Sequence, residues 1–319
     1  HRRGREFPLR GAVEATHRAP RRLLVTPAST LPYPRLFMNT RAIAEQFVRA
    51  RWRAEALAAF PGEIPPTLDG AYEIQDCAIG LWGEAVAGWK VGRIDASWSE
   101  RLGEDRLVGP IFRGGVRNAA QPHSAAPAAA RDARASASGE GIEFPVFEGG
   151  FAAVEAEFVF RLLADAPSTK LTWKAEEAAE LPVALHVGIE SAGSPLAATN
   201  ELGPLAVVSD FGNNAGLLLG PEIAAWRERP MASFTCETFI EGGSVGCGGA
   251  LSLPGGPLAA LAFALQRCAR RGRPLSTGAL VSTGATTGIH GIHSGQRARV
   301  RFEGIADLTC RAVPAVARR

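Results

Sequence analysis

FAAVEAEFVFRLL (residues 151–163) is the clearest strand pattern in this sequence, because apolar side chains recur at every second position. Successive side chains of a β-strand point to opposite faces, so Glu155 and Glu157 share one face. The residues that share the other face are Val154, Ala156, Phe158 and Phe160. We therefore expect a strand with two neighbouring carboxylates on one side and apolar side chains on the other.

Two adjacent carboxylates within an apolar strand repel each other, and an unpaired buried carboxylate costs several kcal/mol. A divalent cation would remove that cost, because Mg²⁺ and Mn²⁺ prefer oxygen ligands. Glu190, near the end of HVGIES (186–191), supplies a third carboxylate that would complete an octahedral site together with water and substrate. The alternatives are a solvated strand face, Lys or Arg partners for the pair, and an exposed Glu190.

Lys90 lies in GWKVG (88–92), within an apolar strand flanked by glycines. Burial in such a place lowers the pKa of a lysine, which then moves protons or stabilises an enolate. The alternative is an edge-strand lysine that reaches to solvent.

Two turn-like segments hold candidate substrate-binding residues. Asn214 belongs to DFGNNAG (210–216), and the segment 282–288 reads STGATTG. The candidates in the second segment are Ser282, Thr283 and Thr286. Their amide and hydroxyl groups are suited to binding a carboxylate, although Asn and Gly are also typical of simple turns.

The rest of the chain predicts helices first and many strands afterwards, which indicates an α+β fold. We expect helices over 41–60 with Thr40 as the cap, over 71–85 with the start near Thr67 or Asp69, and over 257–272. Further strands are expected over 88–94, 109–112, 184–191, 205–212, 279–290 and 298–313.

The sequence divides into three parts. Residues 1–37 are rich in Arg and Pro, and we interpret them as a non-native or disordered leader before a start at Met38, with a transit peptide as the alternative. Residues 38–87 form the expected helical portion, and 88–312 the expected β-rich catalytic domain. The Ala- and Ser-rich residues 124–139 predict a flexible insert within that domain.

Composition argues against several classes of protein. The net charge is +3 and no basic stripe with interleaved aromatics occurs, so we expect no nucleic-acid partner. No apolar run reaches the roughly 20 residues of a membrane-spanning helix. The five cysteines lack zinc-site spacing and favour a reducing, cytoplasmic location. The G-x-S-x-G pattern at 242–246 lacks a following helix, so we do not interpret it as a nucleophile motif.

Six motifs occur in an order that resembles the 2-keto-4-pentenoate hydratase family of the fumarylacetoacetate hydrolase superfamily. The motifs are AYEIQ (71–75), GWKVG (88–92), VEAEFVF (154–160), HVGIES (186–191), SDFGNNAG (209–216) and VSTGATTGIH (281–290). The resemblance covers roughly Ala71 to Leu308. It implies a mixed β-sheet roll with a smaller N-terminal helical portion, and usually a homo-oligomer.

The resemblance also implies the chemistry of the site. Glu155, Glu157 and Glu190 would hold Mg²⁺ or Mn²⁺, the metal would chelate the carboxylate and 2-oxo oxygens of a small 2-oxo acid, and Lys90 would assist proton transfer. One departure concerns an acidic residue that the family carries after the GWK strand. The matching region here, 103–112, offers only Asp105, shifted by a few residues.

The expected reaction is the addition of water to 2-hydroxypenta-2,4-dienoate by a hydro-lyase. Decarboxylation of a 4-oxalocrotonate-type diacid and hydrolysis of an acylpyruvate are alternatives within the superfamily. The hydrolases use a His–Glu pair, for which His123 is a poor candidate beside the predicted insert. A non-catalytic relative that binds a metabolite is the alternative of a different class.

Overall fold

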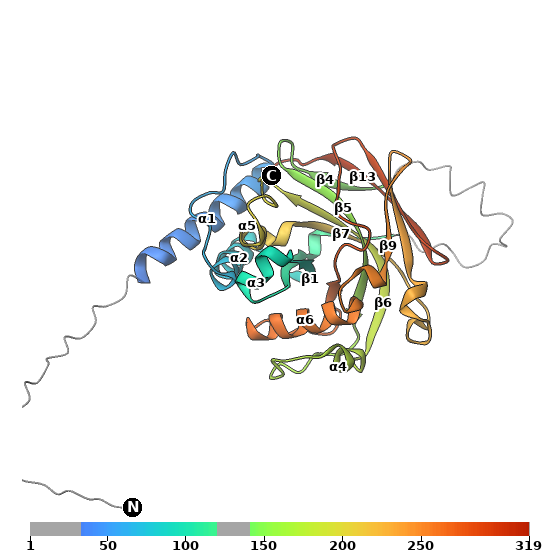
Figure 1. Ribbon diagram of the computed structural model, residues 1–319. Helices are drawn as coiled ribbons and strands as arrows, with labels where there is room; N and C mark the ends of the chain where they lie inside the picture. The colour runs from blue at the N-terminus through green and yellow to red at the C-terminus, as the bar shows by residue number, and fades with distance from the viewer. Residues whose placement is uncertain (1–32, 120–140, 319) are drawn as a thin grey trace, which may run out of the picture.

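The computed structural model describes residues 33–119 and 141–318, and Figure 1 shows helices beside a body of long strands. Two helices, α1 (Tyr33–Arg53) and α2 (Leu68–Trp82), pack against each other at one side of this body. The fold is α+β with mixed sheets and a smaller helical part, as predicted. Residues 1–32 of the predicted leader and the predicted insert at 124–139 lie outside the described residues.

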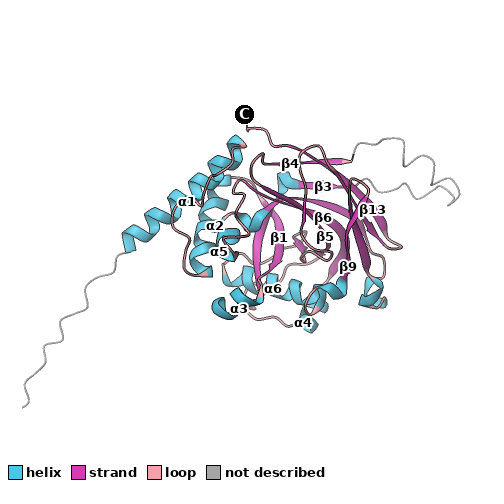
Figure 2. Ribbon diagram, turned by 45° about the horizontal axis from the view of Figure 1, so that its top comes forward, coloured by secondary structure: helices cyan, strands magenta, loops and turns pink. Residues whose placement is uncertain are grey.

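A curved mixed sheet of eight strands carries the candidate site (Figure 2). Seven strands follow in the order β2 (Arg106–Phe112), β1 (Val86–Arg93), β10 (Leu280–Ser282), β5 (Phe151–Leu162), β6 (Val183–Ser194), β7 (Asn214–Glu222) and β3 (Val116–Asn118). The eighth, β11 (His290–Gly291), pairs with β5. The pairs β1–β10 and β3–β7 are parallel, and the others are antiparallel. Because β2 at one edge also contacts β7 near the other edge, the sheet curls back toward itself.

A second sheet of five strands packs against β5. Its order is β4 (Ile142–Val146), β13 (Ala306–Pro314), β12 (Arg297–Phe302), β8 (Thr235–Ile240) and β9 (Gly243–Gly249). The ring of Phe158 lies 5.8 Å from that of Phe302 and 5.9 Å from that of Phe234. The even-numbered apolar face of β5 is therefore buried against the second sheet.

The opposite face of β5 holds the carboxylates, as the period of two requires. Beyond them along the strands lies a small apolar cluster of the curved sheet, formed by Ile111, Val159, Leu217, Leu219 and Leu280. In the register of β5 with β6, Glu155 lies opposite Glu190, and Val159 lies opposite His186. This face of the curved sheet is therefore polar around the three carboxylates and apolar farther along the strands.

The remaining helices are short, apart from one. They are α3 (Ala96–Leu102), α4 (Ala175–Ala179), α5 (Pro204–Ser209) and α6 (Gly256–Arg270), with 3-10 turns at Arg113–Gly115, Phe211–Asn213, Trp226–Glu228, Met231–Ser233 and Ala250–Ser252. The Thr67 side chain caps α2 by accepting from the Gly70 amide, as its sequence predicts. No helix in the two described ranges is long and apolar enough to cross a membrane.

Three predicted elements differ from the observed ones. The first helix begins at Tyr33 and ends at Arg53, well before residue 60. Ala54 is left-handed with φ 55°, and the Leu57 amide instead donates to the Pro195 carbonyl at 2.8 Å. The tertiary strand-like pairing of Leu57 thus replaces the last turns of the predicted helix.

The predicted strand at 205–212 is wrong, because these residues form α5 and a left-handed turn. Gly203 (φ 92°) and Pro204 at the first helical position start α5. A short buried apolar run does not distinguish a strand from a helix by its pattern. The predicted strand at 279–290 is two short strands, separated by a loop in which Gly284 and Gly288 have φ near 110° (109° and 107°).

Leu261 on α6 has no exposed surface, whereas Leu251 is 69% exposed. We predict that Leu261→Ala lowers the free energy of unfolding by about 2–5 kcal/mol, because it leaves a cavity in the core. Leu251→Ala should change it by less than about 0.5 kcal/mol. Urea denaturation of both variants measures the difference, and equal stabilities would contradict the packing of α6.

Candidate metal centre

Three carboxylates from two neighbouring strands converge at one point of the curved sheet. Glu155 and Glu157 lie on β5, and Glu190 lies on β6 directly opposite Glu155. One oxygen from each carboxylate lies within 4.8 Å of the others. Glu155 is 4% exposed and the other two are not exposed at all. The structure therefore brings together the three residues that the sequence singled out, in a place shielded from water.

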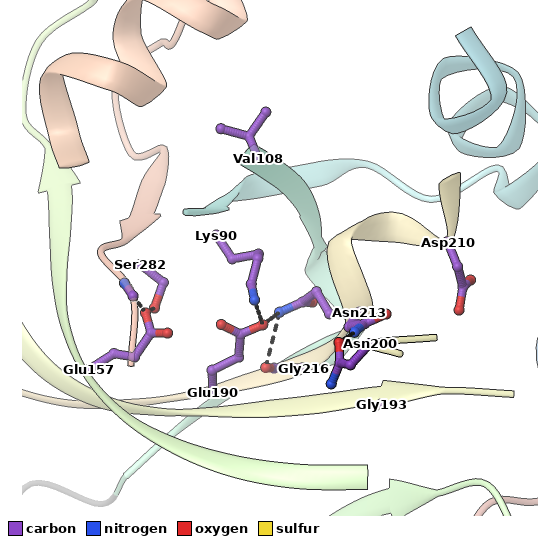
Figure 3. Close-up of polar contacts among 12 residues, drawn as sticks. Lys90, Val108, Glu157, Glu190, Gly193, Asn200, Asp210, Asn213, Gly216 and Ser282 are labelled. Carbon is purple, nitrogen blue, oxygen red and sulfur yellow. Dashed lines mark hydrogen bonds and ion pairs between the residues drawn. The ribbon is translucent and has the colours of Figure 1, made fainter. Parts of the chain in front are cut away.

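Protein donors hold one oxygen of two of these carboxylates and leave the other oxygen without a partner (Figure 3). Glu157 Oε2 accepts from the hydroxyl of Ser282 and, at 2.9 Å, from the amide of Gly284. Glu190 Oε1 accepts from Asn214 Nδ2 at 3.0 Å and pairs with Lys90 Nζ at 3.2 Å. Glu157 Oε1 and Glu190 Oε2 are buried and, among the described residues, have no hydrogen-bond partner.

The burial of these groups shifts their titration. Burial raises the pKa of Glu155 to about 7, although the charge of Lys90 opposes the shift. Burial, followed by the charges of Glu190 and Glu155, raises the pKa of Glu157 well above its ordinary value. Three carboxylates facing one ammonium leave two negative charges when all are ionised. A divalent cation balances that charge, and the two unpartnered oxygens are suitable ligands for it.

Lys90 is 5% exposed and lies on β1 between β2 and β10. Burial lowers its pKa, but the charges of Glu190, Glu155 and Glu157 together outweigh burial, so the pKa is raised. The expectation of a lowered pKa is therefore wrong for the protein without a metal, because the isolated strand pattern does not include these three carboxylates. Lys90 is a charged partner of Glu190 here.

The four predicted substrate-binding residues all form hydrogen bonds that hold a carboxylate of the site or the backbone of β5. Asn214 and Ser282 hold Glu190 and Glu157, as described above. The hydroxyl of Thr283 donates to the Phe158 carbonyl at 2.8 Å, and that of Thr286 to the Ala156 carbonyl at 2.6 Å. These bonds attach the loop after β10 to β5. A substrate-binding role for the four residues stays a prediction, and of the four only Thr283 lines the adjoining cavity.

A cavity of about 480 Å³ opens beside the carboxylates and includes Lys90, Glu155, Thr283 and Gly284 in its lining. Apolar side chains in the lining are Ile94, Leu107, Phe151, Val207, Leu253 and Ile289. The charged residues elsewhere in the lining are Arg93, Asp95, Asp105 and Arg106. The Asp105 side chain is 60% exposed and pairs with Arg106 at 2.7 Å, so it is not a desolvated acid.

Sequence patterns missed a second buried pair next to this centre. Arg51 on α1 binds Asp210 with a separation of 2.6 Å, and both side chains are almost fully buried. A lone arginine in a helix carries no signal of its partner 159 positions away. The G-x-S-x-G pattern that we set aside is not part of the centre, because its residues 243–246 lie on β9 of the second sheet.

No family model matches the sequence, and no curated protein matches it. Solved structures do share the fold. The chain is similar to 4-oxalocrotonate decarboxylase from Pseudomonas putida G7 complexed with magnesium and adipate, with a TM-score of 0.68 and 18% identity over 90% of this chain and 100% of that one. The calcium and acetate complex of the same enzyme gives a TM-score of 0.65 and 17% identity over the same shares of the two chains. The fold is therefore the fumarylacetoacetate hydrolase type that the sequence motifs led us to expect.

We predict that the metal-free protein loses stability as the pH rises from about 4.5 to about 7. The raised pKa of Glu155 means that the folded protein binds the carboxyl proton more tightly than the unfolded chain does in this pH range. The stability gained from that proton is therefore fully present below pH 4.5 and lost as the pH rises above about 7. Thermal unfolding in chelator across this range measures the slope. Glu155→Gln should flatten the slope, and a stability that rises through the window in the wild type alone would contradict the assignment.

Proposed function

We propose that this protein is a divalent-metal-dependent enzyme in which Glu155, Glu157 and Glu190 hold Mg²⁺ or Mn²⁺. The observation that carries the proposal is the pair of buried, unpartnered oxygens on Glu157 and Glu190. Leaving such atoms unsatisfied is costly, and a metal ligand bond is the simplest way to satisfy them. A non-catalytic relative would gain nothing from three buried carboxylates.

The proposed substrate is a small 2-oxo acid that occupies the cavity beside Glu155. When bound, the cation would supply Lewis-acid chemistry, polarising the 2-oxo group and stabilising the enolate that forms from it. Lys90 lines the cavity and its ammonium lies beside the carboxylate of Glu190. We therefore assign the Lys90 ammonium to holding or moving a proton.

Two lyase reactions fit these groups, and both pass through a dienolate. Hydration of 2-hydroxypenta-2,4-dienoate is the reaction that the sequence motifs favour. It needs a group that delivers water to the far carbon. Among the described residues, the acids lining the cavity besides Glu155 are Asp95 and Asp105. Both acids are exposed to solvent, so neither is held in a dry position beside the reacting carbons.

Decarboxylation of an unsaturated 2-oxo diacid is the second candidate, and two observations favour it. The first is the similarity to 4-oxalocrotonate decarboxylase, which was complexed with a dicarboxylate, adipate. The second is the presence of Arg93 and Arg106 in the cavity lining, where a guanidinium is suited to a second carboxylate. In this reaction the far carboxylate leaves as carbon dioxide, and its bonding electrons enter the dienolate, which is then protonated.

Acylpyruvate hydrolysis has less support. His123 lies outside the described residues, and no histidine of the described part of the chain lines the cavity. Homo-oligomer formation and a cytoplasmic location stay predictions.

We predict that turnover of a 2-oxo acid substrate requires Mg²⁺ or Mn²⁺ and stops in chelator. Glu157→Gln keeps the shape of the side chain but weakens a metal ligand, so kcat/KM should fall by about 100-fold or more. Glu303→Gln, which changes an exposed glutamate in the turn between β12 and β13, is the matched control and should leave kcat/KM unchanged. Full activity of the wild type in chelator would refute the metal-dependent reaction.

Product analysis separates the two lyases. We predict that 4-oxalocrotonate releases carbon dioxide, and that Arg106→Gln lowers kcat/KM for this diacid by about tenfold through the loss of one charge-assisted contact. The same substitution should change kcat/KM for 2-hydroxypenta-2,4-dienoate by less than about twofold, because that substrate has one carboxylate. Product formation followed by NMR decides the outcome. Water addition to the monoacid without decarboxylation of the diacid would make hydration the reaction.

A further inference from the structure

The turn between α5 and β7 has an unusual backbone. Phe211, Gly212 and Asn213 are all left-handed, with φ values of 55°, 63° and 61°. Two of the three are not glycine, and such residues are strained in this conformation. A strained turn persists only when surrounding contacts hold it.

The turn lies against Lys90. A Cβ added to Gly212 would lie 3.5 Å from Lys90 Cδ, so the side of Gly212 that carries no side chain faces Lys90. A Cβ added to Gly109 would clash with the Phe211 carbonyl oxygen, so the turn packs directly on the backbone of β2 as well. The turn therefore lies beside both β2 and the Lys90 side chain.

The turn also ends at a residue that holds a carboxylate. Asn214 follows it immediately and donates from Nδ2 to Glu190 Oε1 at 3.0 Å. That same oxygen pairs with Lys90 Nζ at 3.2 Å. The orientation of Glu190, and with it the direction of the unpartnered Oε2, thus depends on where the turn places Asn214 and Lys90.

Arg51 of α1 connects this turn to the sheet. Its Nε and Nη2 bind Asp210 Oδ1 and Oδ2 at 2.6 Å and 2.9 Å. Nη2 also donates to the Gly193 carbonyl at 2.8 Å, and Nη1 to the Asn214 carbonyl at 3.3 Å. The guanidinium therefore joins both ends of the turn to β6, three residues beyond Glu190.

Stability alone does not explain this pair. A buried ion pair is often no more stabilising than packed apolar residues of the same size, whereas its directional bonds specify one geometry. We propose that Arg51 is a positioning residue for the metal centre. Through Asp210 it keeps the left-handed turn in place, and the turn in turn sets Asn214 against Glu190 and Gly212 against Lys90. The metal part of this inference rests on the proposed function.

The test compares Arg51→Met with a double variant, Arg51→Met with Asp210→Leu, which leaves no unpaired buried charge. Arg267→Met is the matched control, because Arg267 is also nearly buried and ion-paired but contacts none of the residues of the centre. Mn²⁺ affinity is measured by electron paramagnetic resonance, and thermal unfolding is recorded on the same metal-free samples. We expect the double variant to remain folded and to bind Mn²⁺ at least about tenfold more weakly, within the range for loss of a supporting contact. The control should stay within about twofold of the wild type.

Hydrogen–deuterium exchange of the metal-free proteins supplies a readout that does not depend on the metal. Faster exchange at 209–217 in the double variant, with no change there in Arg267→Met, supports the positioning role. Arg51→Lys, which keeps the charge but not the paired contacts, should give an intermediate effect on exchange and affinity. A folded double variant with wild-type affinity and wild-type exchange overturns the inference. If the wild type binds no Mn²⁺, the proposed function fails, and exchange alone decides the role of Arg51.

Discussion

The burial of three carboxylates around a single ammonium is the constraint on which the rest of this structure depends. Glu155, Glu157 and Glu190 lie in a nearly dry part of the curved sheet, where Lys90 is the one opposite charge at close range in the described part of the chain. Like charges in a low-dielectric site raise one another's pKa, and burial adds to the effect. The folded protein tolerates these charges only if protons or a cation balance them. The polar groups of the site therefore favour ligand binding rather than the stability of the fold.

The groups that hydrogen-bond to the carboxylates are also arranged in a way that favours ligand binding. Ser282 and the Gly284 amide occupy one oxygen of Glu157, while Asn214 and Lys90 occupy one oxygen of Glu190. Each carboxylate is thereby locked in orientation with its second oxygen left available. Ligands fixed before binding lose little conformational freedom when a metal arrives, which is the advantage of a preorganised centre. The main core and the apolar cluster on the two faces of the curved sheet provide the rigid frame.

Helix α1 of the helical portion reaches the surroundings of the metal centre through a single side chain. Arg51 comes from α1, and its guanidinium binds Asp210 and the carbonyls of Gly193 and Asn214. Loops between strands tolerate change, but a loop that carries left-handed, non-glycine residues needs outside support. Helix α1 thus contacts the turn beside a centre whose three candidate ligands all come from the sheet.

Local pattern alone determined the strand 151–162, the shared face of Glu155 and Glu157, and the helices that begin after Thr67 and near Pro257. These features depend on side-chain period and on caps, which act between neighbours in the chain. Only the tertiary structure decided the raised pKa of Lys90, the early end of α1 where Leu57 pairs with Pro195, and the Arg51–Asp210 pair. Each of these features depends on groups that are far apart in sequence but close in space. Charges and strand-like pairings act over short distances in space, and the order of residues along the chain does not give those distances.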